Sequence, residues 1–418
     1  MTATLHPRTT AAGETVPVPY DSAQLRAATE PTERRRMLLA NLGAITDELA
    51  AGAETSDAER SLSDRSADAL RRAGVLGLMV PEDLGGNPVD PLTVYEIISR
   101  ISAIDTSTAW VTAILLQGAG ELATVLSPEE AGALFRERIP LRVLSLAPGT
   151  ATRTTTGFRV SGRWNFLTGL RQADYVAVTF TVEGDDTGER RCALVPKQEL
   201  ELIDDWDVLG MRGTGSSSVR AEGVEIAARF VYDRFAPASY PRQNTMMARL
   251  GPTPYVLLAN AGHPLGAARR ALDFIIDAAP RIRRGARINS APVPSLAEAS
   301  WFQRELGELD TQWAAADSLV RATLTQVGAR LTAGEPIELA DTDRLQVASS
   351  FATKTALEIV TRVFRHLGAG AILDSHPVGR QLRDLNTLAA HGGLGEAGFE
   401  SHGEFVLGLQ DEGSRRLV

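Results

Sequence analysis

The pattern of apolar and polar positions divides this chain into three stretches of different character. Residues from about 32 to 138 repeat apolar positions at helical spacing, and helix-start signals such as Asp90-Pro91 interrupt them. From about 141 to 232, short runs of β-branched and aromatic residues alternate with Gly, Asp and Pro, which is typical of antiparallel hairpins. Long helical stretches return after about residue 250. This order lacks the strand–helix alternation of a doubly wound sheet and predicts an α+β fold.

These patterns predict four segments. Residues 1–30 begin with a stretch rich in Thr and Pro that lacks the apolar region of a signal peptide, so we expect a disordered tail. We expect an N-terminal helical domain at 31–140, a central β-domain at 141–240 and a C-terminal helical domain at 241–418. Within the first helical domain, Ser127 is followed three residues later by Glu130, which is the pattern of a capping box at a helix start.

Composition and charge narrow the range of partners. The 418 residues include 43 basic and 52 acidic side chains, and the resulting net charge of −9 argues against nucleic acid or an anionic membrane as the main partner. No apolar run approaches the roughly 20 residues that a membrane-spanning helix needs. The single cysteine, Cys192, excludes an internal disulfide and fits a cytoplasmic location. The six histidines show no metal-ligand spacing, so we expect no metal site.

Three motifs carry most of the functional information. A Gly-rich segment occupies 74–86, the run Trp-Asn-Phe-Leu-Thr-Gly occupies 164–169, and the run Trp-Asp-Val-Leu-Gly-Met-Arg-Gly-Thr-Gly-Ser occupies 206–216. Together they resemble the acyl-CoA dehydrogenase superfamily, and the resemblance covers roughly residues 35 to 410. It implies a helical N-domain, a central antiparallel β-domain and a C-terminal four-helix bundle. It also implies a homotetramer assembled through that bundle.

The resemblance places a flavin against the 164–169 motif. In that family a hydroxyl at the position of Thr168 faces N5 of the flavin ring, and a second strand, here around 145–149, also contacts the cofactor. A Gly-rich turn of the neighbouring subunit, matched here by 368–370, touches the phosphate arm, and an arginine of the 281–287 cluster assists. The cofactor-binding residues implied are Ser145, Pro148, Gly149, Trp164, Leu167, Thr168, Gly169, Arg284, Gly368, Ala369 and Gly370. For Trp164 and Trp110, core packing is an equal alternative.

The C-terminal part separates two reactions of this superfamily. Acyl-CoA dehydrogenases abstract a proton with a glutamate that follows an Arg-Asp pair. This chain has the pair Arg383-Asp384, but the family spacing leads to His391-Gly392-Gly393, with Gly392 in place of the glutamate. Without that base, dehydrogenation is disfavoured, and Glu396 could replace it only if the loop shifted.

The same pattern resembles the oxygenase components of two-component flavin monooxygenases. There the histidine deprotonates a phenol or hydrogen-bonds the C4a-hydroperoxide, so His391 is the expected catalytic base, together with Thr168 as a catalytic residue. No strand–GxGxxG–helix unit for a nicotinamide occurs, so we expect reduced FMN or FAD from a separate flavin reductase, with O2 as the second substrate.

A small aromatic or natural-product molecule is the expected substrate. Its pocket is assigned to Trp110, Gln117, Arg212 and Thr214. Many hydroxylases of this group carry a second histidine near Gln117, and glutamine cannot take a proton. N-oxygenation, S-oxidation and oxidative coupling therefore remain open beside hydroxylation. A dehydrogenase and a redox-silent flavin-binding paralogue are the alternatives from other classes.

Overall fold

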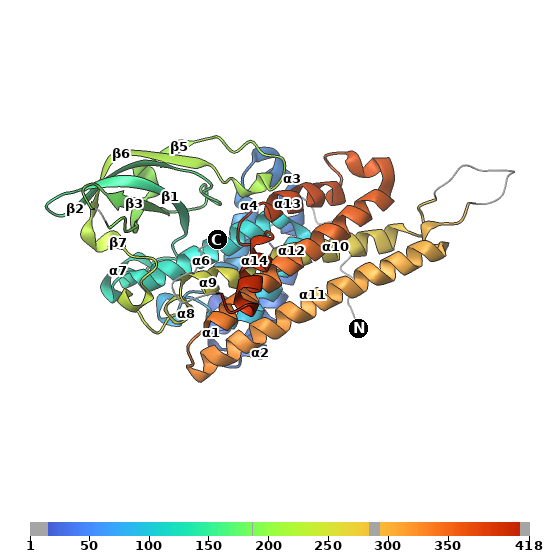
Figure 1. Cartoon of the computed structure of the whole chain (residues 1–418), viewed down its shortest axis with the longest axis horizontal. Helices are drawn as coiled ribbons and strands as arrows, with labels where there is room; N and C mark the ends of the chain where they lie inside the picture. The colour runs from blue at the N-terminus through green and yellow to red at the C-terminus, as the bar shows by residue number, and fades with distance from the viewer. Residues whose placement is uncertain (1–15, 186, 284–292, 410–418) are drawn as a thin grey trace. The chain divides into compact units, whose positions relative to one another are not determined.

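The computed structural model describes residues 16–185, 187–283 and 293–409, which form two compact units (Figure 1). The described parts of 1–97, 107–208 and 212–256 form the first unit. The second unit consists of 98–106, 209–211 and the described residues from 257 onward. The predicted order of helices, then strands, then helices is confirmed.

Helices make up the described N-terminal part before the sheet. They are α1 (Ser22–Ala27), α2 (Pro31–Ala44), α3 (Thr46–Glu59), α4 (Asp64–Arg72), α5 (Pro91–Ile104), α6 (Thr106–Val125) and α7 (Pro128–Leu134). Two predicted helix starts are confirmed. Helix α5 begins at Pro91, and Asp90 accepts a hydrogen bond from the backbone N–H of Thr93. Helix α7 begins at Pro128 behind a complete capping box of Ser127 and Glu130.

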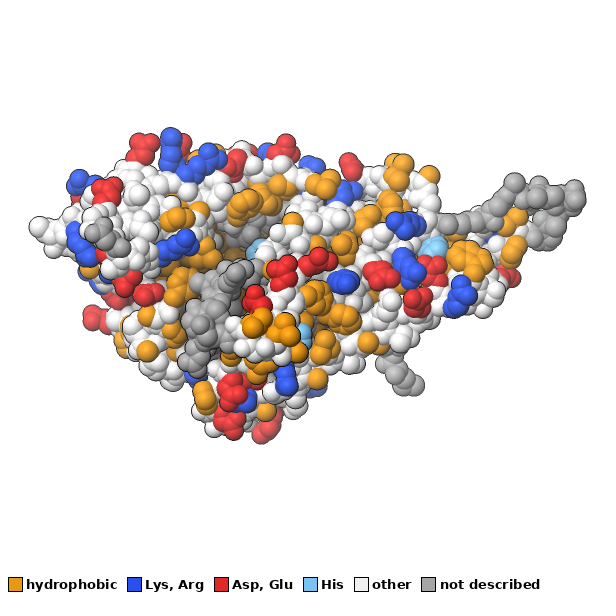
Figure 2. All heavy atoms as spheres, viewed as in Figure 1, with side chains coloured by type: hydrophobic (Ala, Val, Ile, Leu, Met, Phe, Trp, Pro, Cys, Tyr) orange, Lys and Arg blue, Asp and Glu red, His pale blue; other side chains and the backbone are white. Residues whose placement is uncertain are grey.

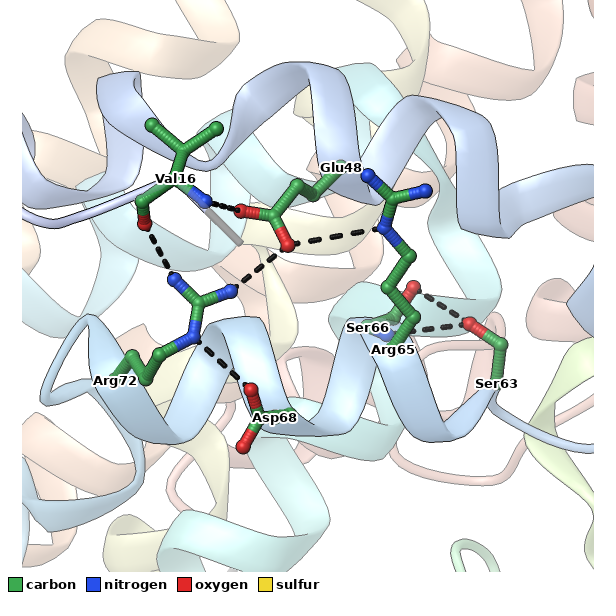
Figure 3. A network of polar contacts seen from close by, with 7 residues as sticks. All are labelled: Val16, Glu48, Ser63, Arg65, Ser66, Asp68 and Arg72. Carbon is green, nitrogen blue, oxygen red and sulfur yellow. Dashed lines mark hydrogen bonds and ion pairs between the residues drawn. The ribbon is translucent and has the colours of Figure 1, made fainter. Parts of the chain in front are cut away.

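Residues 16–30 are packed against these helices, which differs from the disordered tail expected through residue 30. The backbone of Val16 donates to Glu48 (3.2 Å) and accepts from Arg72 (2.6 Å), and Arg72 also binds Glu48 at 2.8 Å (Figure 3). Further along, Asp21 caps α1, and Leu25 on that helix is completely buried. Asn41 binds the backbone of Tyr20, and Arg34 binds the carbonyl of Ala28. These long-range contacts hold the segment, and composition alone does not reveal them.

The central strands form one seven-stranded sheet. They are β1 (Arg142–Arg153), β2 (Gly157–Trp164), β3 (Tyr175–Val182), β4 (Arg191–Pro196), β5 (Glu201–Ile203), β6 (Ser218–Ala227) and β7 (Val231–Tyr232), in the order β5-β6-β2-β1-β3-β4-β7. All pairs are antiparallel except β1 with β3. The sheet is therefore mixed rather than antiparallel throughout.

The parallel pair arises from the connection between β2 and β3. Residues 165–174 carry the chain past the start of β1 to its other edge, where the N–H groups of Asp174 and Tyr175 donate to the carbonyl of Leu141. A tight hairpin would have placed β3 beside β2 and antiparallel to it. The 164–169 motif begins at the last residue of β2 and continues into this connection, so the sheet topology positions the expected flavin loop.

The second unit is a helical bundle. Its helices are α10 (Gly262–Ala278), α11 (Ser300–Ala333), α12 (Leu339–Leu367), α13 (Pro377–Ala389) and α14 (Ala397–Val406). Between the sheet and this bundle, α8 (Met246–Leu250) and the first half of α9 (Pro252–Asn260) still belong to the first unit. Helix α12 packs against α10, α11, α13 and α14, and α11 runs beside it (Figure 1). Buried residues such as Leu272, Ile359 and Leu385 fill the space between them. The predicted four-helix bundle is confirmed as α10–α13, with α14 packed on α12.

Close backbone packing in α6 leads to a stability prediction. A Cβ atom added at Gly118 would overlap the carbonyl oxygen of Arg142, whereas one added at Gly132 in α7 would meet no atom within 4 Å. We expect Gly118→Ala to lower the free energy of unfolding by about 1–3 kcal/mol, because the backbone must shift. Gly132→Ala should raise it by up to about 1 kcal/mol through helix propensity. Urea unfolding of both variants tests the difference, and equal effects would contradict it.

Among the described residues, no helix combines the length and the apolar character that crossing a membrane requires.

Candidate active site

Thr168 lies within a buried chain of side-chain hydrogen bonds in the first unit, between Trp110 and Ser216. The indole N–H of Trp110 donates to its hydroxyl at 3.2 Å. The hydroxyl of Thr168 is 2.8 Å from that of Ser216, which is 2.7 Å from that of Thr214. The structure thus brings together three residues expected at the site, Thr168, Trp110 and Thr214. It adds the side chain of Ser216, which ends the 206–216 motif and the loop expected at the pocket but was not predicted as an individual site residue.

Backbone hydrogen bonds join the two motifs that carry these side chains. The N–H of Gly169 donates to the carbonyl of Thr214 at 2.9 Å, and the N–H of Leu167 donates to that of Ser217 at 3.1 Å. Leu167 is completely buried, so the cofactor contact expected for it stays a prediction. A left-handed backbone at Phe166 (φ 59°) turns its ring outward, where 68% of the residue is exposed. These contacts hold Thr168 in a fixed position beside an exposed apolar ring.

The expected second flavin strand is attached to the same loop. The hydroxyl of Ser145 donates to the carbonyl of Asn165 at 3.0 Å, at a register irregularity between Ser145 and Pro148 in β1. Pro148 is exposed, and Leu146 beside it is 44% exposed. A flavin ring needs apolar surface and a hydrogen-bonding group for N5 in a site that excludes water. The hydroxyl of Thr168 and the exposed apolar residues around it fit these needs.

Trp164 and Gly149 have a packing role in the sheet domain. The Trp164 ring is completely buried, and its N–H donates to the carbonyl of Thr179 at 2.9 Å. A Cβ atom at Gly149 or Gly162 would overlap this ring. Of the two alternatives that the sequence left open for Trp164, these contacts favour core packing. Trp110, by contrast, is 8% exposed and bound to Thr168.

The other two expected pocket residues bind neighbouring backbone. The side-chain amide of Gln117 donates to the carbonyl of Val256 at 3.0 Å, and Tyr255 donates to the carbonyl of Gln117 at 3.0 Å. Arg212 begins a 3-10 turn, η4 (Arg212–Thr214), and donates to the carbonyl of Asp57 at the end of α3. Gln117 therefore links α6 to the segment Pro252–Asn260, and Arg212 links the second motif to α3. The role of both side chains toward a substrate stays a prediction.

His391 lies in the second unit, in the turn between α13 and α14. The N–H of Gly393 donates to its Nδ1 atom at 3.2 Å. Part of the residue is exposed to solvent. The surrounding protein nevertheless removes enough water from the imidazole to lower its pKa, so the ring is mainly neutral at pH 7. A neutral ring that accepts at Nδ1 carries its proton on Nε2. In this tautomer His391 offers an N–H donor rather than a basic lone pair at Nε2.

The Arg383-Asp384 pair has a structural role within the second unit. Asp384 is 2% exposed and accepts a hydrogen bond from the N–H of Met211 at 2.6 Å. A Cβ atom at Gly210 would overlap the backbone of Arg383. Residues 209–211, in the middle of the second motif, are thereby held on α13, whose C-terminal end leads into His391. This use of the aspartate is not evident from the sequence.

The Gly-rich turn after α12 is open. Residues Gly368–Ile372 form the 3-10 turn η8, in which Gly368, Ala369 and Gly370 are exposed. A Cβ atom at Gly368 or Gly370 would meet no atom within 4 Å, although φ of +73° at Gly368 favours glycine. The turn has room for an approaching phosphate arm, and that role stays a prediction. Arg284, the arginine assigned to the same arm, lies outside the described residues.

Buried His263 makes the stability of the fold depend on pH. Burial, with a smaller effect of nearby His391, lowers the pKa of the His263 imidazole to about 3. Below about pH 6.5 the unfolded chain binds a proton here and the folded chain does not, so acid favours unfolding. We expect this group to remove roughly 3 kcal/mol of stability between pH 6.5 and pH 4. In urea unfolding, His263→Gln should show a shallower pH dependence; an unchanged one would contradict the assignment.

Comparisons with known proteins agree with this architecture. The family model described as "Acyl-CoA dehydrogenase, N-terminal domain" matches residues 32–129, and "Acyl-CoA dehydrogenase, C-terminal domain" matches residues 258–396. Indole-3-acetate monooxygenase of Pseudomonas putida is 25% identical over 358 residues, which cover 85% of this chain and 89% of that protein. The oxygenase subunit HsaA of a flavin-dependent monooxygenase from Rhodococcus jostii is 25% identical over 359 residues, or 84% of this chain and 92% of that protein.

A solved structure supports the same fold. XiaF from Streptomyces sp., solved in complex with FADH2 and glycerol, superimposes with a TM-score of 0.82 at 23% identity, covering 92% of this chain and 98% of that one. The N-terminal helices, the sheet and the C-terminal bundle are thus shared with proteins of known structure. The two family models together cover more than half of the sequence. This chain belongs to the acyl-CoA dehydrogenase family.

Proposed function

We propose that this chain is the oxygenase component of a two-component flavin-dependent monooxygenase. One observation carries the proposal: the turn after α13 offers the imidazole of His391 and a glycine, Gly392, where a dehydrogenase of this family has its carboxylate base. The relatives are named as monooxygenases, and one of them as an oxygenase subunit, which supports the same reading. A separate reductase would then supply reduced FMN or FAD, and a cytoplasmic location fits that arrangement.

Three residues of the candidate site, Thr168, Phe166 and His391, have a defined task in this proposal. Bound reduced flavin supplies the chemistry that activates O2. Thr168 orients the flavin at N5, and the exposed ring of Phe166 offers apolar surface beside it. Through its Nε2–H, His391 donates a hydrogen bond to an oxygen of the substrate. This tautomer favours orientation and hydrogen bonding over the proton abstraction that the sequence led us to expect.

We propose a small aromatic molecule as the substrate. The relatives include an indole-3-acetate monooxygenase, so indole-3-acetate and simple phenols are the first compounds to test. Gln117, which is bound to Val256, cannot act as a base in addition to His391, because an amide does not take a proton. N-oxygenation and S-oxidation therefore stay within the proposal. They are distinguished by identifying the oxygenated product by mass spectrometry.

Acyl thioesters separate the proposed oxygenase from a dehydrogenase. Under anaerobic conditions, the protein loaded with oxidised FAD should keep its flavin absorbance when an acyl-CoA series is added, because no carboxylate base is available at Gly392. Loss of the absorbance would show α-proton abstraction and overturn the proposal. Failure of the wild-type protein to bind either flavin would point instead to the redox-silent alternative.

We also propose a homotetramer assembled through the bundle. An apolar groove of about 450 Å³ lies between α11, α12 and α14, and Leu319, Phe351 and Phe399 line it. Hydrophobic side chains are visible on the surface over these helices (Figure 2). A second copy of the chain would cover them. Light scattering should give about four times the chain mass of 44.8 kDa, and a monomer in solution would refute this assembly.

A further inference from the structure

The hydroxyls of Thr168, Ser216 and Thr214 form a chain in which each oxygen has one proton. All three residues are less than 10% exposed: Thr168 is 7%, Ser216 is 4% and Thr214 is 1% exposed. The two oxygen–oxygen distances, 2.8 and 2.7 Å, are those of good O–H···O hydrogen bonds. A serine hydroxyl could accept from both neighbours, but the described residues offer the Ser216 proton no acceptor other than Thr168 and Thr214. Ser216 therefore donates to one of them and accepts from the other.

Only two arrangements satisfy this chain. In the first, Thr168 donates to Ser216, which donates to Thr214. In the second, the direction is reversed, and Ser216 donates to Thr168. Trp110 donates to Thr168 in both arrangements and occupies one of its two lone pairs. Toward the cofactor side, Thr168 therefore presents a lone pair in the first arrangement and its proton in the second.

The two arrangements match different redox states of a flavin. N5 of reduced flavin carries a hydrogen and is a donor, whereas N5 of oxidised flavin is an acceptor. We propose that Ser216 and Thr214 are positioning residues that let Thr168 accept a hydrogen bond from the N5–H of reduced flavin. This inference rests on the proposed function, because it requires a flavin at Thr168. The preference for reduced flavin then comes from the hydroxyl groups of Thr168, Ser216 and Thr214.

Substitution of Thr214 tests best in which direction the three hydroxyls donate their hydrogen bonds. In Thr214→Val the shape is kept but the acceptor for the Ser216 proton is removed. Ser216 then bonds best by donating to Thr168, which turns the Thr168 proton toward the N5–H of reduced flavin. In Thr214→Ser the methyl group is lost and the hydroxyl is kept, so the chain stays intact. A packing role for Thr214 predicts the opposite order, since only the serine variant leaves a cavity.

The measurement is the ratio of dissociation constants for reduced and oxidised flavin, determined anaerobically with FMN and with FAD. We expect Thr214→Val to weaken the binding of reduced flavin relative to that of oxidised flavin by roughly tenfold, because the Thr168 O–H and the flavin N5–H then face each other. That ratio corresponds to a shift of the bound-flavin potential by about 30 mV to lower values. Thr214→Ser should keep the wild-type ratio and potential.

Three outcomes are informative. A potential shift in the valine variant and none in the serine variant supports the hydroxyl chain. Unchanged ratios in the valine variant, or a larger shift in the serine variant, would overturn it while leaving flavin binding and the proposed function intact. Should the valine variant not fold, Ser216→Ala gives the same test, because Thr168 loses its internal acceptor and reduced flavin is again disfavoured.

Discussion

Replacing Glu121 by Gln should lower the free energy of unfolding by about 3–5 kcal/mol, the largest stability effect we expect from a single substitution in this chain. The Glu121 carboxylate in α6 is 2% exposed. It binds Arg142 of β1 at 2.6 Å, Arg234 after β7 at 3.1 Å and the hydroxyl of Tyr232 at 2.9 Å. Burial opposes its charge, but the two guanidinium groups outweigh burial and hold the pKa of Glu121 below its ordinary value. Without this carboxylate, two buried cations would lack their shared counter-charge.

Urea unfolding near pH 7 measures the effect of the Glu121 substitution. The matched control is Glu225→Gln, which removes a carboxylate from an exposed ion pair with Arg159, and it should hardly move the unfolding midpoint. A Glu121→Gln variant as stable as the wild type would mean that the cluster does not hold α6, β1 and the segment after β7 together.

Substitution of His391 should have the largest effect on activity. We expect His391→Ala to lower the oxygenation rate by about 10²- to 10³-fold, because a positioned hydrogen-bond donor is lost. A glutamine amide can place an N–H donor where Nε2–H was, so His391→Gln should keep roughly tenfold more activity than the alanine variant. If His391 instead acts as a base, both variants should be equally slow.

The pH profile gives a second readout for His391. Because burial lowers the pKa of its imidazole, the neutral tautomer should predominate at pH 7 and persist below the ordinary histidine value. Protonation of Nδ1 would set its new N–H against the N–H of Gly393 and displace the ring, so the rate of the wild type should fall below the ordinary histidine value of about 6.5. This acid limb should disappear in His391→Gln, which has no titrating ring. An acid limb that remains in the glutamine variant would assign the titration to another group.

The order of structural elements could be read from the sequence because it depends on local signals. Apolar periodicity distinguished the helical parts from the sheet, and the capping box at Ser127 and the N-cap at Asp90 mark helix starts by short-range hydrogen bonds. The resemblance of the 164–169 motif singled out Thr168, and the structure places it in a hydroxyl chain rather than alone.

Features that depend on contacts between residues far apart in the sequence could not be predicted from it. The parallel pairing of β1 with β3 follows from the path of residues 165–174, and the strand pattern is the same for either direction. Ser216 is 48 positions from Thr168, and nothing in its surroundings distinguishes it from a turn serine. The role of His391 depends on which ring nitrogen accepts a hydrogen bond, and only the fold around Gly393 determines that.

Rapid mixing of the protein and anaerobically reduced flavin with oxygenated buffer tests the monooxygenase assignment most directly, since it needs no knowledge of the substrate. With the correct cofactor, FMN or FAD, the absorbance of oxidised flavin should return only after a lag relative to free flavin, because the protein controls the reaction with O2. Immediate reoxidation at the rate of the free cofactor, with both flavins, would contradict an oxygenase component.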